Sequence, residues 1–241
     1  MTTNFRAVLE NEKKHSLSVV IPFFNEAELV SDVLREIRSI LPTAEIIAVD
    51  DGSTDGTGKI ISDLNDIRLI ALQKNCGQSA AMYAGLRAAK GELIAMMDGD
   101  GQNDPAEISK LVEAMSSADV VFGVRKNRQD TMSRLIASKI ANAIRRLALG
   151  DNATDTGCSL KVIRREHVAL LVPFNGLHRY LPAFLQRAGL KSVEVPVNHR
   201  SRKAGVSKYT IKGRALRGIY DLIGVRWLLS RRIIWPVDQI P

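Results

Sequence analysis

Two short acidic motifs contain the residues of this chain that are best suited to chemistry. Asp50 and Asp51 follow an apolar run and precede a glycine-rich turn, and Asp98 and Asp100 occupy the same kind of position further along. Asp98 and Asp100 can hold Mg²⁺ or Mn²⁺, which proteins bind through one or two carboxylates together with a substrate's phosphates. Asp50 and Asp51 can accept hydrogen bonds from a nucleobase or ribose hydroxyls. Acidic turns are common, so neither motif alone decides a function.

Two other kinds of binding site do not fit the sequence. Asp51, Ser53 and Asp55 imitate the start of a calcium-binding loop, but the twelfth position is Ser62 where that loop needs Glu. The first apolar run is followed by Pro22, with Asn25 and Glu26 shortly after it, and not by a glycine-rich phosphate loop. The chain is therefore a poor match to NAD-dependent enzymes and P-loop ATPases.

The elements that must position these residues alternate between short apolar runs and longer amphipathic segments. This alternation is typical of an α/β fold with a mostly parallel central sheet flanked by helices. We expect strands at 17–21, 45–49, 68–72, 93–97, 120–124, 160–163 and 192–195. We expect helices at 28–41, 57–64, 79–89, 105–115, 132–149, near 167–171, at 179–188 and at 214–235. Because ligands bind at the carboxyl ends of such strands, both acidic motifs belong at the expected binding edge.

The net charge of +8 is concentrated near the C-terminus. Residues 199–241 contain ten Lys or Arg and two acidic residues, while residues 1–198 are balanced. The expected helix at 214–235 is amphipathic, with Arg214, Asp221 and Arg232 on one side and Ile219 and Leu229 on the other. It predicts either a helix lying in a membrane interface or a terminal helix docked on its own domain. We divide the chain into a catalytic domain, 1–209, and a basic amphipathic segment, 210–241.

The cysteine positions and the apolar runs bear on where the protein is located in the cell. Cys76 and Cys158 are far apart and lack the spacing of a zinc site, which suits a reducing environment. No secretory signal opens the chain and no run of about 18 apolar residues is present. We therefore expect a cytoplasmic protein associated peripherally with the cytoplasmic face of a membrane.

Three longer motifs narrow the interpretation. They are Asp98-Gly99-Asp100-Gly101-Gln102 with Pro105, Asp155-Thr156-Gly157-Cys158-Ser159, and Asn198-His199-Arg200-Ser201-Arg202 continuing through Gly205-Val206-Ser207-Lys208-Tyr209. With Asp50-Asp51 and the Pro22…Asn25-Glu26 opening, the chain resembles family 2 glycosyltransferases of the GT-A fold over residues 17–235. Within that family it looks closest to the polyprenyl- and dolichyl-phosphate glycosyltransferases. Cys158-Ser159-Leu160-Lys161 departs from the pattern of those enzymes, so Lys161 is given no role.

The resemblance implies a set of site residues. The metal, Mg²⁺ or Mn²⁺, would be held by Asp98, Asp100 and Gln102. Catalytic roles would fall to Asp100, Asp155 and Arg125. The donor would be bound by Pro22, Asn25, Glu26, Asp50, Asp51, Asp98 and Gln102, and the acceptor phosphate by Arg200, Arg202, Ser207 and Lys208.

The implied activity is metal-dependent transfer of a sugar, with inversion, from a GDP- or UDP-sugar to polyprenyl phosphate at a membrane surface. Two alternatives stay open at this stage. One is a glycosyltransferase that acts on a glycan hydroxyl, which would need a general base. The other is a non-catalytic nucleotide-sugar or nucleic-acid binding protein. Because the aromatic residues near the basic segment have helical spacing, we expect no nucleic-acid partner.

Overall fold

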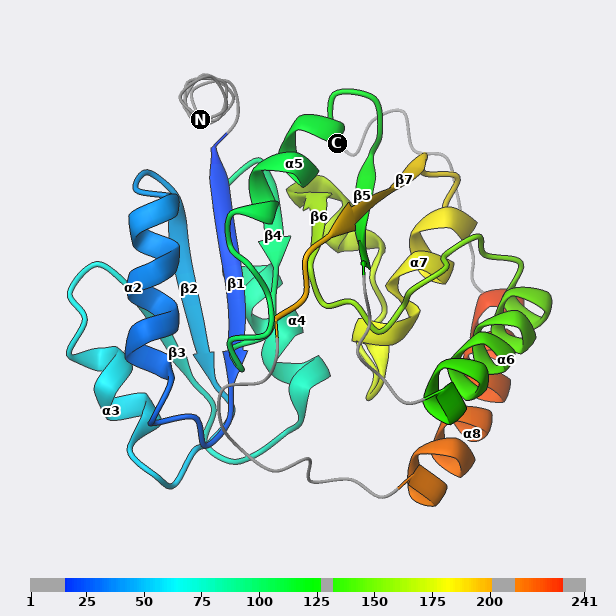
Figure 1. The fold of residues 1–241 in the computed structure, drawn as a ribbon, viewed down its shortest axis with the longest axis horizontal. Helices are drawn as coiled ribbons and strands as arrows, with labels where there is room; N and C mark the ends of the chain where they lie inside the picture. The colour runs from blue at the N-terminus through cyan, green and yellow to red at the C-terminus, as the bar shows by residue number, and fades with distance from the viewer. Residues whose placement is uncertain (1–15, 127–131, 201–210, 232–241) are drawn as a thin grey trace, which may run out of the picture.

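A seven-stranded mixed sheet forms the centre of the protein (Figure 1). The computed structural model describes residues 16–126, 132–200 and 211–231, with side chains described for the same residues except 132–139 and 211–217. The strands are β1 (Leu17–Phe23), β2 (Glu45–Asp50), β3 (Arg68–Ala71), β4 (Leu93–Met96), β5 (Val120–Arg125), β6 (Lys161–Arg164) and β7 (Ser192–Val197). Their order across the sheet is β3-β2-β1-β4-β6-β5-β7.

Helices cover both faces of this sheet. They are α2 (Val30–Ile40), α3 (Thr57–Ser62), α4 (Gln78–Ala88), α5 (Glu107–Ala114), α6 (Met132–Leu149), α7 (Leu177–Arg187) and α8 (Ile211–Arg231), with a 3₁₀ turn η1 (Arg165–Leu170). One apolar core joins the sheet to α2, α3 and α5. A second core joins the opposite face to α4, α7, η1 and α8. The expected α/β architecture is confirmed.

Alternating side chains of β1 show how one strand serves two cores. Val19 and Ile21 pack into the first core and Val20 into the second, and all three are fully buried. A strand buried on both faces has no polar side to alternate with, so its sequence is a continuous apolar run. That is why the runs in the sequence mark the strands well.

The sheet is mostly parallel, as expected, but β6 runs antiparallel to both of its neighbours, β4 and β5. The other four pairings are parallel. The sequence did not indicate which strand would be antiparallel, because a short apolar run has the same pattern in either direction. As a result β5 is parallel to β4, and Arg125 at its end lies at the same edge as the carboxyl ends of β1, β2 and β4.

Helix α8 docks on the domain, alongside α6 and against α7 (Figure 1). Val225 and Leu229 are buried in the second core, and Asp221 forms a 3.0 Å ion pair with Arg179 of α7. Ile219, expected on the same face as Leu229, is instead 58% exposed. Only part of the apolar side of the helix therefore packs against the domain, and the rest is exposed. The division at residue 209 stays a prediction.

Candidate active site at the sheet edge

The carboxyl ends of three parallel strands bring the two acidic motifs together. Pro22 lies opposite Val49, and Val20 lies opposite Met96, in the register of the sheet. Asp50 at the end of β2 and Asp98 just beyond β4 therefore stand at nearly the same level on either side of β1. The sequence-based expectation of a shared binding edge agrees with this placement.

The Asp50–Asp51 turn is tied to the loop before α4. Asp51 is buried and accepts N–H bonds from Cys76 at 2.7 Å and Gly77 at 2.9 Å. Burial raises the pKa of its carboxyl, although both hydrogen bonds oppose the effect. Asp50 accepts the N–H of Ser53 at 3.0 Å. Asp51 thus fixes the loop that borders the site, which the sequence pattern did not reveal.

Asn25 and Glu26 lie where the loop after β1 meets the turn after β2. The Asn25 N–H donates to the Ser53 hydroxyl and its side-chain oxygen accepts the Thr54 N–H, both at 2.9 Å. The Glu26 N–H donates to the Thr57 hydroxyl at 2.9 Å. Asn25 has a left-handed backbone, φ 54°, a conformation that Asn adopts more readily than most residues. These bonds hold the two donor-side loops in one arrangement.

The second acidic motif has the chemistry of a divalent-cation site. Asp98 is half-buried and accepts a 2.6 Å hydrogen bond from the Gln78 amide, while Asp100 accepts the Gln102 N–H at 3.1 Å. Burial, and then the neighbouring charge of Asp100, raise the pKa of Asp98. Two carboxylates that repel each other are stabilised by a cation, and these contacts leave acceptor capacity on both. Among the described residues, no cluster of three or more His, Cys, Asp or Glu could hold a metal unaided.

A substrate-assisted magnesium or manganese site needs few protein ligands. Mg²⁺ is usually held by one or two carboxylates, with substrate phosphates and water completing the shell. The residues present, Asp98 and Asp100 with Gln102 beside them, therefore fit the expected metal.

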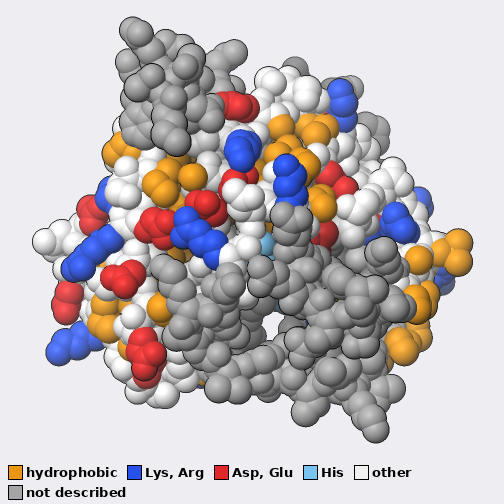
Figure 2. All heavy atoms as spheres, viewed as in Figure 1, with side chains coloured by type: hydrophobic (Ala, Val, Ile, Leu, Met, Phe, Trp, Pro, Cys, Tyr) orange, Lys and Arg blue, Asp and Glu red, His pale blue; other side chains and the backbone are white. Residues whose placement is uncertain are grey.

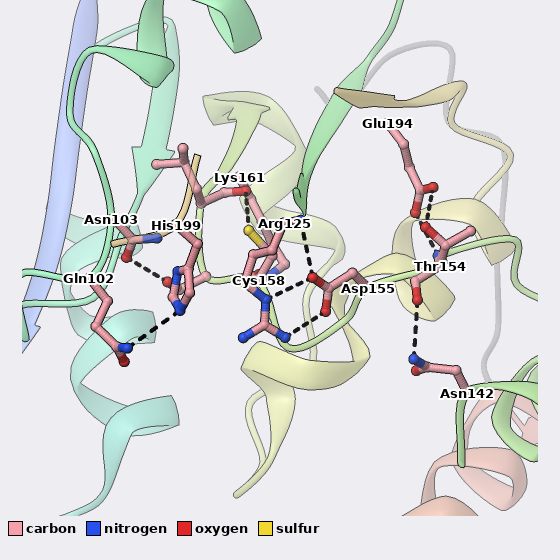
Figure 3. A network of polar contacts seen from close by, with 12 residues as sticks. Gln102, Asn103, Arg125, Asn142, Thr154, Asp155, Cys158, Lys161, Glu194 and His199 are labelled. Atoms are coloured by element: carbon pink, nitrogen blue, oxygen red, sulfur yellow. Dashed lines mark hydrogen bonds and ion pairs between the residues drawn. The ribbon is translucent and has the colours of Figure 1, made fainter. Parts of the chain in front are cut away.

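Hydrogen bonds around Asn103 and Gln102 join this motif to the segments before β6 and after β7; Figure 3 shows part of this network. The buried Asn103 side-chain oxygen accepts the Asp98 N–H at 3.0 Å and the Ser159 hydroxyl at 2.8 Å. Gln102 approaches the His199 ring at 3.4 Å, and Asn103 forms a β-bridge with His199. Asn103 directly follows one quoted motif and His199 lies within another, but neither was given a role from the sequence.

Arg125 and Asp155 form a fork-shaped ion pair (Figure 3). The Asp155 carboxylate accepts hydrogen bonds from Arg125 Nε and Nη2, both at 2.8 Å, and from its backbone N–H at 3.2 Å. The side chains are 17% and 7% exposed. The two side-chain bonds orient the guanidinium, because a carboxylate matches its planar fork. In this structure Asp155 positions a cation.

Arg200 lies between two carboxylates. Its Nη1 contacts Glu36 of α2 at 2.8 Å and its Nη2 contacts Asp104 at 2.9 Å. The hydrogen bond to Glu36 leads the interactions that raise the pKa of Arg200 in spite of its partial burial. Any phosphate contact would have to share the guanidinium with both acids. The other expected phosphate ligands, Arg202, Ser207 and Lys208, lie outside the described residues, as does part of the expected C-terminal helix.

A pocket opens beside Asp98 between α4, α7 and the start of β6. Its lining residues are Pro22, Gln78, Met82, Met96, Met97, Asp98, Thr156, Gly157, Cys158, Ser159, Lys161, His178 and Arg179. Lys161 is buried, donates to the Cys158 carbonyl and has its pKa lowered by burial. Sequence reasoning gave Lys161, Gln78 and His178 no role. Gln78 and His178 directly precede expected helices and Lys161 lies inside an expected apolar strand, and these positions were their only signal.

Comparison with known proteins identifies the family. Residues 18–171 match the family described as glycosyl transferase family 2. The chain belongs to that family. It is 38% identical to the dodecaprenyl-phosphate galacturonate synthase of Rhizobium johnstonii, over 88% of this chain and 67% of that protein. It is 36% identical to the undecaprenyl-phosphate 4-deoxy-4-formamido-L-arabinose transferase of Pectobacterium carotovorum, over 93% of this chain and 72% of that protein.

Solved structures confirm the fold of this family 2 glycosyltransferase. Glucosyl-3-phosphoglycerate synthase from Mycobacterium tuberculosis, in complex with phosphoglyceric acid, superposes with a TM-score of 0.73 and 20% identity, covering 98% of this chain and 92% of that one. The same enzyme in complex with Mn²⁺ and UDP-glucose gives a TM-score of 0.71, with 18% identity and coverage of 92% and 82%. The GT-A fold expected from the sequence is confirmed, and the second of these two complexes contains Mn²⁺.

Proposed function

We propose that this glycosyltransferase moves a sugar from a nucleotide sugar to polyprenyl phosphate, with inversion at the anomeric carbon. The observation that carries the proposal is the meeting of a carboxylate pair, Asp98 and Asp100, and an oriented cation, Arg125, at one sheet edge. The carboxylates suit a metal-bound diphosphate, and the cation suits an anionic acceptor. The names of the relatives at 36–38% identity, which act on dodecaprenyl and undecaprenyl phosphate, support this acceptor class.

The acceptor chemistry explains why a positioned cation matters more than a base. A phosphate monoester has a second pKa of about 6 and is largely dianionic at neutral pH, so its oxygen can attack without losing a proton. Bringing this dianion to an anionic donor requires positive charge nearby. Arg125 has a fixed direction because Asp155 holds it, which supports a role in aligning the acceptor. Arg202, Ser207 and Lys208 stay as proposed further phosphate ligands.

On the donor side, we assign the metal to Asp98, Asp100 and Gln102, with Mg²⁺ and Mn²⁺ both suitable. When bound, the cation would supply charge neutralisation for the leaving nucleoside diphosphate. Asp50 is buried at the end of β2 and suits a hydroxyl or base N–H donor of the nucleoside. Asp51, with Asn25 and Glu26, shapes the nucleoside side through the loop contacts described above.

We also propose that the enzyme works on a membrane surface, at the cytoplasmic face. No helix among the described residues is long and apolar enough to cross a bilayer. Seven large apolar side chains of α6 and α8 are more than half exposed: Ile140, Ile144, Leu147, Ile219, Tyr220, Ile223 and Trp227. We call them the α6–α8 apolar surface. Figure 2 shows apolar side chains at the edge of the molecule where Figure 1 draws α6.

A lipid surface is the occupant that fits this feature best. Contiguous apolar side chains are uncommon on soluble monomers, and Trp and Tyr favour the headgroup level of a bilayer. The proposed acceptor is itself a membrane lipid, so docking here would bring the site to its substrate. Arg226 and Arg231, both exposed on α8, favour anionic headgroups.

A product assay tests the catalytic proposal. Purified protein is incubated with undecaprenyl phosphate in detergent, Mg²⁺ or Mn²⁺, and a panel of UDP- and GDP-sugars, and the lipid fraction is examined by mass spectrometry. We expect one donor to give a glycosyl phospholipid that disappears with EDTA, and NMR of that product to show the inverted anomer. Transfer only to hydroxyl acceptors would overturn the proposal.

Vesicle binding tests the membrane proposal. The protein should sediment with phosphatidylglycerol vesicles, and Leu147→Glu with Trp227→Glu should reduce the bound fraction about tenfold. Ser117→Glu, an exposed change beyond α5, is the matched control and should bind like the wild type. Equal binding by the Leu147/Trp227 double variant would refute the assignment of this surface.

A further inference from the structure

The pocket beside Asp98 is lined by both apolar side chains and hydrogen-bonding groups. Pro22, Met82, Met96 and Met97 supply the apolar part, and the remaining lining residues are mainly polar. A pyranose has the same character, with C–H patches on its faces and hydroxyls at its rim. The pocket adjoins Asp98, where the diphosphate is proposed to bind, and the sugar is attached directly to that diphosphate.

One lining residue, His178, has its hydrogen-bonding role fixed from behind. The Ser79 hydroxyl lies 2.7 Å from His178 Nδ1 and accepts the Gly176 N–H at 2.9 Å. A serine hydroxyl has a single hydrogen, and the structure as described gives that hydrogen no acceptor other than Nδ1. Nδ1 is therefore the acceptor, and the proton of the neutral ring sits on Nε2.

The neutral state of this ring follows from its surroundings. Burial, and then the charges of Arg179 and Lys161, lower the pKa of His178 to about 3. At neutral pH the ring carries no charge and presents Nε2–H as a donor on the pocket side. It is therefore suited to an uncharged hydrogen bond and unsuited to acid–base catalysis near pH 7.

Arg179 adds a second donor to the same pocket. Its Nη2 is committed to Asp221 at 3.0 Å. Its Nε–H is buried and has no hydrogen-bond partner in the part of the chain that the structure describes. A buried donor without a partner is costly, and an oxygen of a bound ligand would remove the cost.

We propose that this pocket receives the transferred sugar and that His178 is a specificity-determining residue, donating its Nε2–H to a sugar oxygen. Arg179 Nε–H donates to a second oxygen of the same ring, and Ser79 is a positioning residue that fixes the His178 tautomer. The inference rests on the proposed function, since it requires a nucleotide-sugar donor. It adds the contact by which the enzyme distinguishes one sugar from another.

The test compares affinity for a nucleotide sugar with affinity for its nucleoside diphosphate. Calorimetry with Mn²⁺ would use UDP-galacturonate and UDP-glucose against UDP, and GDP-mannose against GDP. His178→Phe should weaken the sugar nucleotide roughly three- to tenfold and leave the diphosphate unchanged, as loss of one hydrogen bond predicts. His178→Gln, whose amide N–H can replace Nε2–H, should restore most of the loss. His167→Gln is the matched control and should change neither affinity.

Three outcomes would overturn the inference. One is an unchanged affinity ratio with a raised KM for undecaprenyl phosphate, which would place His178 on the acceptor phosphate. Another is equal weakening of both nucleotides without rescue by Gln, which would mean a structural role only. The third is no preference for any sugar nucleotide over its diphosphate in either variant or the wild type. Failure of the lipid product assay alone would refute the acceptor and leave the sugar pocket standing.

Discussion

Lowering the pH should destabilise the protein through His178. In the folded protein burial holds the pKa of this ring at about 3, whereas an unfolded histidine titrates near 6.5. Between these values the unfolded chain binds a proton that the folded chain does not. The stability that depends on the neutral ring is therefore complete above about pH 6.5 and is lost as the pH falls towards 3.

The magnitude follows from that difference. Each pKa unit corresponds to about 1.4 kcal/mol, so at pH 5 the gap of about 1.5 units below the unfolded pKa costs roughly 2 kcal/mol. At pH 7 the same term is only about 0.2 kcal/mol. The full effect, reached only below pH 3, would be about 5 kcal/mol, comparable to the whole free energy of unfolding of many domains.

The assay is urea unfolding at pH 7 and pH 5, for the wild type and for His178→Gln. Glutamine cannot titrate, so the variant removes this proton uptake and keeps a hydrogen-bonding side chain. All other groups contribute equally to both proteins. We expect the wild type to lose about 2 kcal/mol more than the variant between the two pH values. Identical losses would refute the assignment of His178 as a buried neutral ring.

Three further perturbations test the site and its support. Asp100→Asn should reduce kcat by at least about 100-fold with an unchanged circular dichroism spectrum; normal turnover with normal metal dependence would contradict the metal assignment. Asp155→Ala removes the carboxylate that forms the fork-shaped pair with Arg125 and should lower the free energy of unfolding by about 3 kcal/mol in urea titration, part of which the added change Arg125→Met should recover. Gly99→Ala places a Cβ 2.4 Å from the Phe23 ring and should cost about 1–3 kcal/mol, whereas Gly224→Ala, with open space around it, should not destabilise.

The sequence predicted the positions of the strands and helices well. It predicted less well which side of a helix packs against the domain. Strands buried on both sides are continuous apolar runs, so their positions were predictable, and α6 was found with its expected limits. Helix α7 begins at Leu177, two residues before the expected start, because Gly176 in a left-handed conformation ends the preceding turn. The sequence showed that α8 has an apolar side. It did not show which residues of that side, such as Leu229 but not Ile219, pack against the domain. That depends on the neighbours α6 and α7, which a helical wheel does not contain.

Some residues of the candidate site could be proposed from the sequence, whereas the contacts between them appeared only in the structure. Asp50, Asp98 and Asp100 could be proposed from the sequence because each follows an apolar run and occurs together with the longer motifs of the family. The chain by itself thus determined the fold class, the binding edge and the family. Only the tertiary structure decided that Asp155 holds Arg125, and that His178 and Ser79, 99 positions apart, are hydrogen-bonded beside the pocket. Local periodicity reports burial along one element, whereas such partnerships depend on how separate elements pack, and no local pattern records that.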